Sequence, residues 1–168
     1  MIRVVVDDIA FVRADAVVRP ATATLEPTTA ALRRLEQVGG PAFWQQLKVQ
    51  QELAVGAAVV TGGGELASPL VVHAIIMSAS EPVSSTGVRR ALTSALQRAQ
   101  DWEISELATP IVGTGAGGLA FDDAAEILCR LVTAHTAGAS YPREVTVVVE
   151  REEEKQTVER VLQRLRGE

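Results

Sequence analysis

The sequence has one cysteine, few aromatic residues and no long apolar run. Cys129 is the single cysteine among 168 residues, so no disulfide can form within the chain and a reducing cytoplasm is expected. Aromatic residues make up 4% of the chain, so the core must consist mainly of Val, Leu, Ile and Ala. No apolar stretch approaches the roughly 20 residues of a membrane span, and acidic residues stand near the N-terminus where a signal peptide needs basic ones. These absences predict a cytoplasmic protein with no membrane partner.

The sequence also lacks an excess of positive charge. Its formal net charge is -5 at pH 7. A domain that binds nucleic-acid phosphates usually carries a basic face, so a nucleic-acid partner is not expected. The two histidines, His73 and His135, are far apart and form no metal-ligand spacing with the single cysteine. We therefore expect neither a metal nor a cofactor.

The composition indicates one folded domain over residues 1–168, with 47% hydrophobic and 22% charged residues. Apolar runs predict strands at residues 2–6, 15–18, 57–61, 70–77, 107–112 and 145–149. Pro20 is expected to stop the second strand. Helical spacing predicts helices at residues 25–38, 41 to about 53, 85–99, from the loop after residue 118 to 132, and 152–166. Strands that are apolar throughout belong in a sheet covered on both faces, which predicts an α/β fold with three α/β/α layers.

A glycine-rich loop is the sharpest feature of the sequence. Gly113, Gly115, Gly117 and Gly118 follow an apolar strand and precede a helix. Without side chains, such a loop can adopt positive φ and direct successive N–H groups at one ligand, and the following helix adds its positive end. The loop has no lysine and does not fit the nucleoside-triphosphatase pattern. It predicts a site for a phosphate or diphosphate; the alternative is a tight turn without a ligand.

Four segments together resemble the macro-domain family. They are the acid at Asp8, DAVVRPAT at residues 15–22, VVHA at residues 71–74 and VGTGAGG at residues 112–118. The resemblance covers nearly the whole chain and implies a three-layer α/β/α macro-domain fold with a mixed, mostly parallel sheet. It implies binding of ADP-ribose or a related nucleotide diphosphate, free or on an ADP-ribosylated protein. We expect a monomer or weak dimer.

The same resemblance implies the site residues. Asp8 would accept a hydrogen bond from the adenine amine, beside the backbone N–H of Ile9, and the chain around Ala21 and Thr22 would approach the distal ribose. The diphosphate would be wrapped by the loop residues Gly113, Thr114, Gly115, Ala116, Gly117, Gly118 and Leu119.

The sequence departs from the family pattern where the distal ribose would bind. Arg19-Pro20-Ala21-Thr22 replaces the family's NAAN motif, and Glu26-Pro27-Thr28-Thr29 replaces its first glycine-rich loop. We therefore expect binding without catalysis and assign no catalytic residue. One alternative is an ADP-ribosyl or O-acetyl-ADP-ribose hydrolase with an atypical first loop. Another is a degenerate macro domain that acts as an interaction or nucleic-acid module, with Arg19 or Glu26 filling the pocket.

Three further side chains have simple structural interpretations. Arg19 stands at the end of a predicted strand, where it would face an anion or form a surface ion pair. His73 lies in an apolar strand and is expected to be a hydrogen-bonded core residue. Cys129 has no nearby base and is expected to be a buried thiol.

Overall fold

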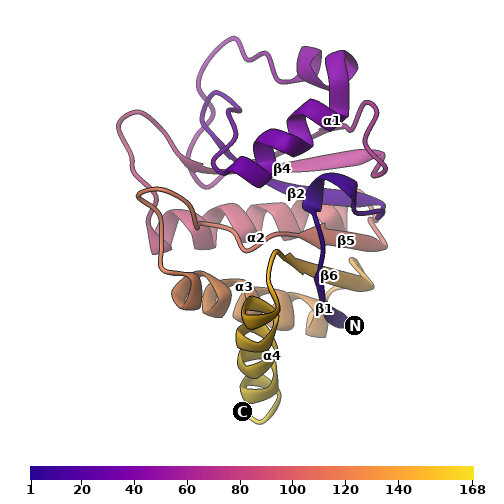
Figure 1. Cartoon of the computed structure of the whole chain (residues 1–168), viewed down its shortest axis with the longest axis vertical. Helices are drawn as coiled ribbons and strands as arrows, with labels where there is room; N and C mark the ends of the chain where they lie inside the picture. Colours follow the sequence, from indigo (N-terminus) through magenta and orange to yellow (C-terminus); the bar gives the residue numbers. More distant parts are fainter.

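The computed structural model describes residues 1–168 and places six strands between two layers of helices (Figure 1). In chain order the elements are β1 (Ile2–Val6), the 3-10 helix η1 (Ile9–Phe11), β2 (Ala16–Thr22), α1 (Ala30–Gln46), β3 (Ala58–Gly62), β4 (Leu70–Met77), α2 (Ser85–Asp101), β5 (Glu106–Thr109), α3 (Phe121–Gly138), β6 (Glu144–Val149) and α4 (Glu152–Arg166).

The strands form one mixed sheet in the order β1-β6-β5-β2-β4-β3. All neighbouring pairs are parallel except β3 and β4, which are antiparallel. Helix α1 and η1 pack on one face, whereas α2, α3 and α4 pack on the other (Figure 1). This confirms the predicted three-layer fold. Because β1 pairs with β6, the first and last strands of the chain lie side by side.

The central strands are buried on both faces, as their continuous apolar sequences predict. All residues of β2 before Thr22 are buried, and so are the six inner residues of β4. His73 is fully buried within β4, and Cys129 is buried in α3, where burial raises the pKa of its thiol to about 12. Both side chains are therefore core residues, as expected. None of the helices is long and apolar enough to cross a membrane.

Pro20 does not stop β2, and that prediction is wrong. The strand continues to Thr22, with Pro20 opposite Ala74 of β4. On its other side β2 pairs with β5 only at Ala16 and Val17. Pro20 therefore lies where one edge of β2 has no neighbouring strand, and its missing N–H leaves no gap in a ladder there.

Helix α1 consists of two segments joined at a break, as the Gly39-Gly40 pair predicts. Gly40 has a φ of +73° and interrupts the helical backbone. Thr29 caps the first segment, since its side chain accepts a hydrogen bond from Leu32 N. The second segment ends at Gln46 and not near Leu53, and Leu53 N donates instead to Ala23 O beyond the end of β2. The predicted length of this helix is therefore wrong.

Candidate ligand-binding cleft

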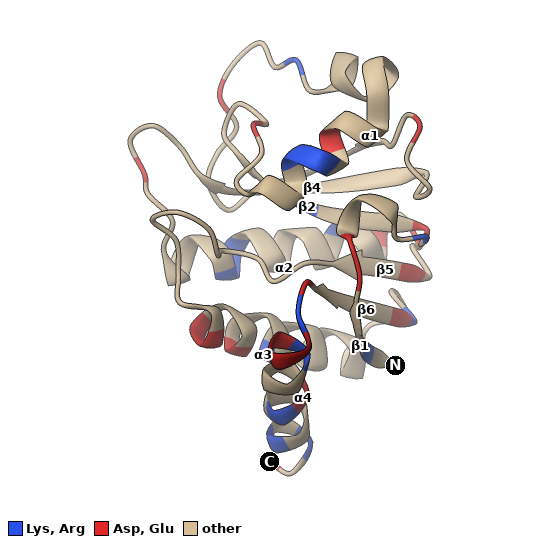
Figure 2. Ribbon diagram, viewed as in Figure 1, with Lys and Arg blue, Asp and Glu red and all other residues tan.

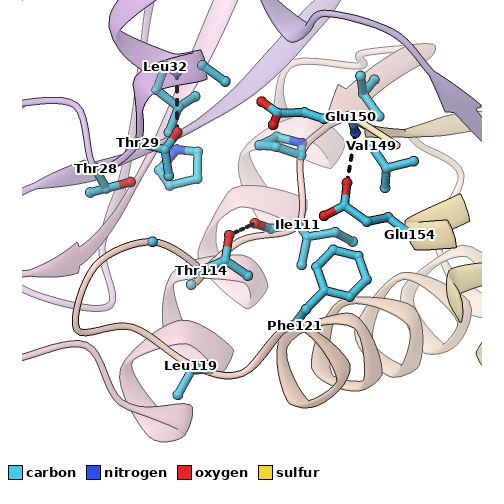
Figure 3. Close-up of a pocket in the computed structure, with 16 residues that line it drawn as sticks. Thr28, Thr29, Leu32, Ile111, Thr114, Leu119, Phe121, Val149, Glu150 and Glu154 are labelled. Atoms are coloured by element: carbon cyan, nitrogen blue, oxygen red, sulfur yellow. Dashed lines mark hydrogen bonds between the residues drawn. The ribbon is translucent and has the colours of Figure 1, made fainter. Parts of the chain in front are cut away.

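A cleft of about 290 Å³ opens at the carboxyl ends of β2, β5 and β6 (Figure 3). This is the edge of a parallel sheet where α/β proteins usually bind ligands. Three parts of the chain form its walls: the loop between β5 and α3, the start of α1, and the segment that joins β6 to α4. The lining residues are Pro20, Thr28, Thr29, Ala31, Leu32, Pro110, Ile111, Gly113, Thr114, Gly115, Leu119, Phe121, Val148, Val149, Glu150 and Glu154.

The glycine loop forms one wall and requires glycine at its key positions. Gly113 has a φ of +104° and Gly115 a φ of +115°, values that other residues rarely adopt. A Cβ at Gly115 would lie 3.0 Å from the carbonyl oxygen of Thr28, and one at Gly113 would lie 2.9 Å from Cγ2 of Val88. The loop can therefore keep this path only with bare backbone at these two positions.

The loop leaves a run of backbone donors unused. Leu119 N donates to Gly113 O at 2.8 Å, and Gly118 N donates to Gly115 O at 3.0 Å, so these two amides hold the loop together. The N–H groups of residues 113–117 donate no hydrogen bond within the chain. Successive unpaired N–H groups in a loop of positive φ form a concave anion site. The arrangement is suited to a phosphate or diphosphate.

The start of α1 forms the opposite wall. Thr29 is the N-cap of α1, and its side chain satisfies one of the free N–H groups at that helix end. Thr28 precedes it, and its Oγ1 is buried without a hydrogen-bond partner. Figure 3 shows Thr28 and Thr29 across the cleft from Thr114. The positive end of the α1 dipole therefore points toward the same space as the loop amides.

The third wall combines apolar and acidic residues. Phe121, at the start of α3, faces Val149 and Glu150 at the end of β6 (Figure 3). Glu154 Oε1 accepts hydrogen bonds from the N–H groups of Glu150 at 3.0 Å and Arg151 at 3.1 Å, which fixes this turn. Phe121 and Glu154 were not among the predicted site residues. The position of Phe121 directly after the glycine loop was the available signal for its role.

The fold, the loop and the cleft agree with a comparison of the chain with known families. A model of the macro domain matches residues 18–128. The chain belongs to the macro-domain family.

Relatives and solved structures resemble this macro domain at low sequence identity. An uncharacterized protein of Aeropyrum pernix is 31% identical over 149 residues, which cover 87% of this chain and 77% of that protein. An uncharacterized protein of Mycobacterium tuberculosis is 27% identical over 132 residues, or 79% of this chain, but this match spans only 37% of that longer protein. A mutant macrodomain of Oceanobacillus iheyensis, solved with ADPR, has a TM-score of 0.87 at 20% identity, with 98% of this chain and 93% of that chain covered.

Asp8 and Ile9 lie near the cleft of this macro domain but do not line it. Asp8 caps η1 through Oδ1, which accepts from Ala10 N at 3.0 Å. Its Oδ2 lies 3.1 Å from Nε of Arg34, and Nη2 of the same arginine lies 3.7 Å from Oε1 of Glu150 in the cleft wall. The N–H of Ile9 donates no hydrogen bond within the chain. Asp8 is thus connected to the cleft through Arg34, and its predicted contact with a base stays a prediction.

The structure does not bring Ala21 and Thr22 to the cleft. Ala21 is fully buried and forms an isolated antiparallel bridge with Pro27. Thr22 Oγ1 accepts a hydrogen bond from Glu26 N at 3.1 Å. Thr22 begins a turn that folds back over the end of β2, and Ala21 is buried beside it. At the loop, the tip residues Ala116 and Gly117 are exposed and, like Gly118, stand outside the lining.

Arg19 faces an anion, the carboxylate of Glu36, but this ion pair lies in the interior, so the prediction of a surface ion pair is wrong. Its side chain is fully buried, with Nη2 donating to Leu25 O at 2.9 Å and forming an ion pair with Glu36 Oε2 at 3.3 Å. Its Nη1 lies 3.3 Å from Nδ1 of His73. Burial, and then the nearby charge of Arg19, lowers the pKa of His73 to about 3. Arg19 of β2 and His73 of β4 are therefore buried polar residues of the sheet.

Proposed function

We propose that this macro domain binds ADP-ribose or a related nucleotide diphosphate in the cleft. The observation that carries the proposal is the run of unpaired N–H groups at residues 113–117, of which residues 113–115 line the cleft opposite the start of α1. A diphosphate offers oxygen acceptors on both phosphates, so one ligand can use donors from both walls. The Oceanobacillus macrodomain of the same fold was solved with ADPR, and this agrees with the proposal.

The diphosphate would be held by backbone dipoles and not by cations. No lysine or arginine is among the lining residues. Figure 2 shows that the loop between β5 and α3 carries no charged residue. Glu150 and Glu154 add negative charge at one side of the cleft. We infer that this side receives the base, where Phe121 and Val149 offer apolar surface, and that the phosphates lie toward Gly115.

We propose binding without catalysis. The lining residues include no histidine, cysteine or lysine. The two lining carboxylates already have partners: Glu154 accepts from two backbone amides, and Glu150 faces Arg34. The hydrolase alternative places Thr22, Thr28 and Thr29 near the distal ribose. Thr22 lies outside the cleft with its hydroxyl bonded to Glu26 N, whereas Thr28 and Thr29 line the cleft. One observation favours the hydrolase alternative: an O-acetyl-ADP-ribose deacetylase of Salmonella gallinarum is 27% identical to this chain over 167 residues.

The biological setting of the site is also a proposal. We infer that residues 1–168 act as one domain, since the pairing of β1 with β6 joins the first and last strands in one sheet. We also propose a cytoplasmic monomer or weak dimer. ADP-ribosylated proteins are the proposed partners. An open cleft at a sheet edge is compatible with a nucleotide attached to a larger molecule.

Isothermal titration calorimetry with ADP-ribose tests the proposed function. Gly115→Ala places a Cβ 3.0 Å from the Thr28 carbonyl oxygen at a φ of +115°, so it should displace the loop and weaken binding. We expect a loss of at least about tenfold, the effect of one charge-assisted hydrogen bond. The matched control is Gly138→Ala at the end of α3, where an added Cβ meets nothing within 4 Å. Absence of binding heat at millimolar ADP-ribose, with the wild-type protein folded, rejects the proposal.

A further inference from the structure

A turn that we call the residue 22–27 turn covers the end of β2, between the lining residues Pro20 and Thr28. Thr22 N donates to Glu26 O at 3.0 Å, and Leu25 N donates to Thr22 O at 2.8 Å. The turn returns across the end of β2 and forms the bridge between Ala21 and Pro27. The end of β2 is thus covered by the chain itself.

Buried side chains fix the residue 22–27 turn in place. Leu25 has a φ of +63°, a strained conformation for a large side chain, and is only 4% exposed. Its carbonyl oxygen accepts from the fully buried Arg19 at 2.9 Å, and its side chain packs with Ala21 and Ile75. Strain of this kind persists only where the surroundings hold it. The turn is a fixed part of the fold that covers the end of β2 beside the cleft.

The glycine loop approaches the start of α1, directly after the residue 22–27 turn. Gly115 lies so near the start of α1 that a Cβ there would be 3.0 Å from Thr28 O and 3.3 Å from Thr29 Cγ2. Thr28 Oγ1, on the cleft wall at this contact, is a buried hydroxyl without a partner. An unpaired buried hydroxyl is costly, and a small movement at the contact between Gly115 and Thr28 would let a ligand oxygen accept from it. The enclosed space therefore ends at Thr28 and Gly115.

We propose that the cleft recognises a nucleoside diphosphate only as far as its second phosphate. The inference rests on the proposed function and narrows its ligand. The second phosphate would lie between the loop amides and the start of α1, and the hydroxyl of Thr28 would donate to one of its oxygens. A ribose beyond that phosphate would lie past the contact between Gly115 and Thr28 and make no enclosed contact. A free terminal phosphate also carries more negative charge than its ribose ester and suits the positive end of α1 better.

Calorimetry on the wild-type chain with ADP, ADP-ribose and AMP tests this inference. We expect ADP to bind at least as tightly as ADP-ribose, and AMP to bind about tenfold or more weakly, because it lacks the second phosphate and its charge-assisted hydrogen bonds. Binding of ADP-ribose at least about tenfold tighter than ADP would show an enclosed ribose, and would overturn the inference while the proposed function stands. Failure of both ADP and ADP-ribose to bind would overturn both.

Thr28→Val isolates the contribution of the hydroxyl, since valine keeps the branched shape. We expect ADP binding to weaken about tenfold, the effect of a hydrogen bond to a charged group, while AMP binding stays unchanged. Thr93→Val on the exposed surface of α2 is the matched control and should leave both affinities unchanged. Equal ADP affinity of Thr28→Val and wild type, with both proteins folded by circular dichroism, overturns the role of Thr28.

Discussion

Nε of Arg34 on α1 lies 3.1 Å from Oδ2 of Asp8, and Nη2 of the same guanidinium lies 3.7 Å from Oε1 of Glu150. One cation thus stands between two carboxylates at the mouth of the cleft. All three side chains are 31–62% exposed, and ion pairs of this kind contribute little to the free energy of unfolding. The arrangement bears more on recognition of the base, because Arg34 and Ala10 N together hold the Asp8 carboxylate in one orientation.

Asp8→Ala should remove a preference for adenine. A carboxylate accepts a hydrogen bond from the exocyclic amine of adenine, whereas inosine diphosphate carries a carbonyl oxygen there. We expect wild type to bind ADP about tenfold more tightly than inosine diphosphate, and the variant to bind both equally. Calorimetry with the two nucleotides measures the ratio. The variant also loses the cap of η1, so its melting temperature should fall with a free-energy cost of about 1 kcal/mol.

Asp101→Ala is the matched control for Asp8. Asp101 is also a partly exposed carboxylate paired with an arginine, Arg98 at 3.6 Å, but it lies at the far end of α2. Its replacement should leave the nucleotide preference unchanged. Equal affinity of the wild-type protein for ADP and inosine diphosphate would exclude a hydrogen bond between the Asp8 carboxylate and the adenine amine.

Nucleotide binding should depend weakly on salt. The lining residues provide no lysine or arginine, and the formal net charge of the chain is -5. Sites that hold phosphates with cations lose affinity as salt screens the charges, over a Debye length of about 10 Å at 0.1 M. Here the N–H donors contact the ligand directly, so we expect ADP affinity to stay constant or rise slightly between low and moderate sodium chloride. A steep fall in calorimetric affinity would instead indicate a cationic site.

The sequence predicts best those parts of the fold that depend on local pattern. The bounds of β1, β4 and α4 agree with the predicted ranges, because their apolar or amphipathic patterns are uninterrupted. The strand containing Pro20 was misjudged because the tolerance for proline there depends on how far β5 extends beside β2. Strand pairing of that kind is a tertiary property, which local pattern does not carry.

The same distinction applies to the candidate site. The glycine loop is predictable because its backbone path itself requires glycine, as Gly113 and Gly115 show. The burial of Arg19 beneath Leu25 was not predictable, since an arginine at a strand end is usually solvated. The contact of Arg34 with Asp8 joins α1 to the segment after β1, and nothing in the spacing of those residues indicates that they meet.

His73 has its hydrogen-bonding positions assigned by its neighbours. Thr61 Oγ1 donates to Gly62 O at 3.0 Å and lies 2.8 Å from His73 Nε2, so the ring nitrogen is the donor in that pair. Nδ1 lies 3.3 Å from Nη1 of Arg19, which can only donate. The ring is therefore neutral with its proton on Nε2. A second proton on Nδ1 would place a positive charge next to the Arg19 cation in the buried interior. Burial, and to a smaller extent the charge of Arg19, lowers the pKa of His73 to about 3.

This lowered pKa should make the protein less stable in mild acid. Between the ordinary histidine pKa of 6.5 and about 3, the unfolded chain binds a proton at this residue and the folded chain does not. The free energy of unfolding should therefore fall as the pH falls below 6.5, by about 1.4 kcal/mol per pH unit from this group. His73→Gln keeps a donor for Thr61 and an acceptor for Arg19 but cannot titrate. Urea unfolding should show wild type more stable than the variant by a constant margin above neutral pH. This margin in the free energy of unfolding should shrink by about 2.5 kcal/mol once the pH is about 1.8 units below 6.5. Parallel stability curves for the two proteins would show that His73 gains its proton in the folded state as readily as in the unfolded one.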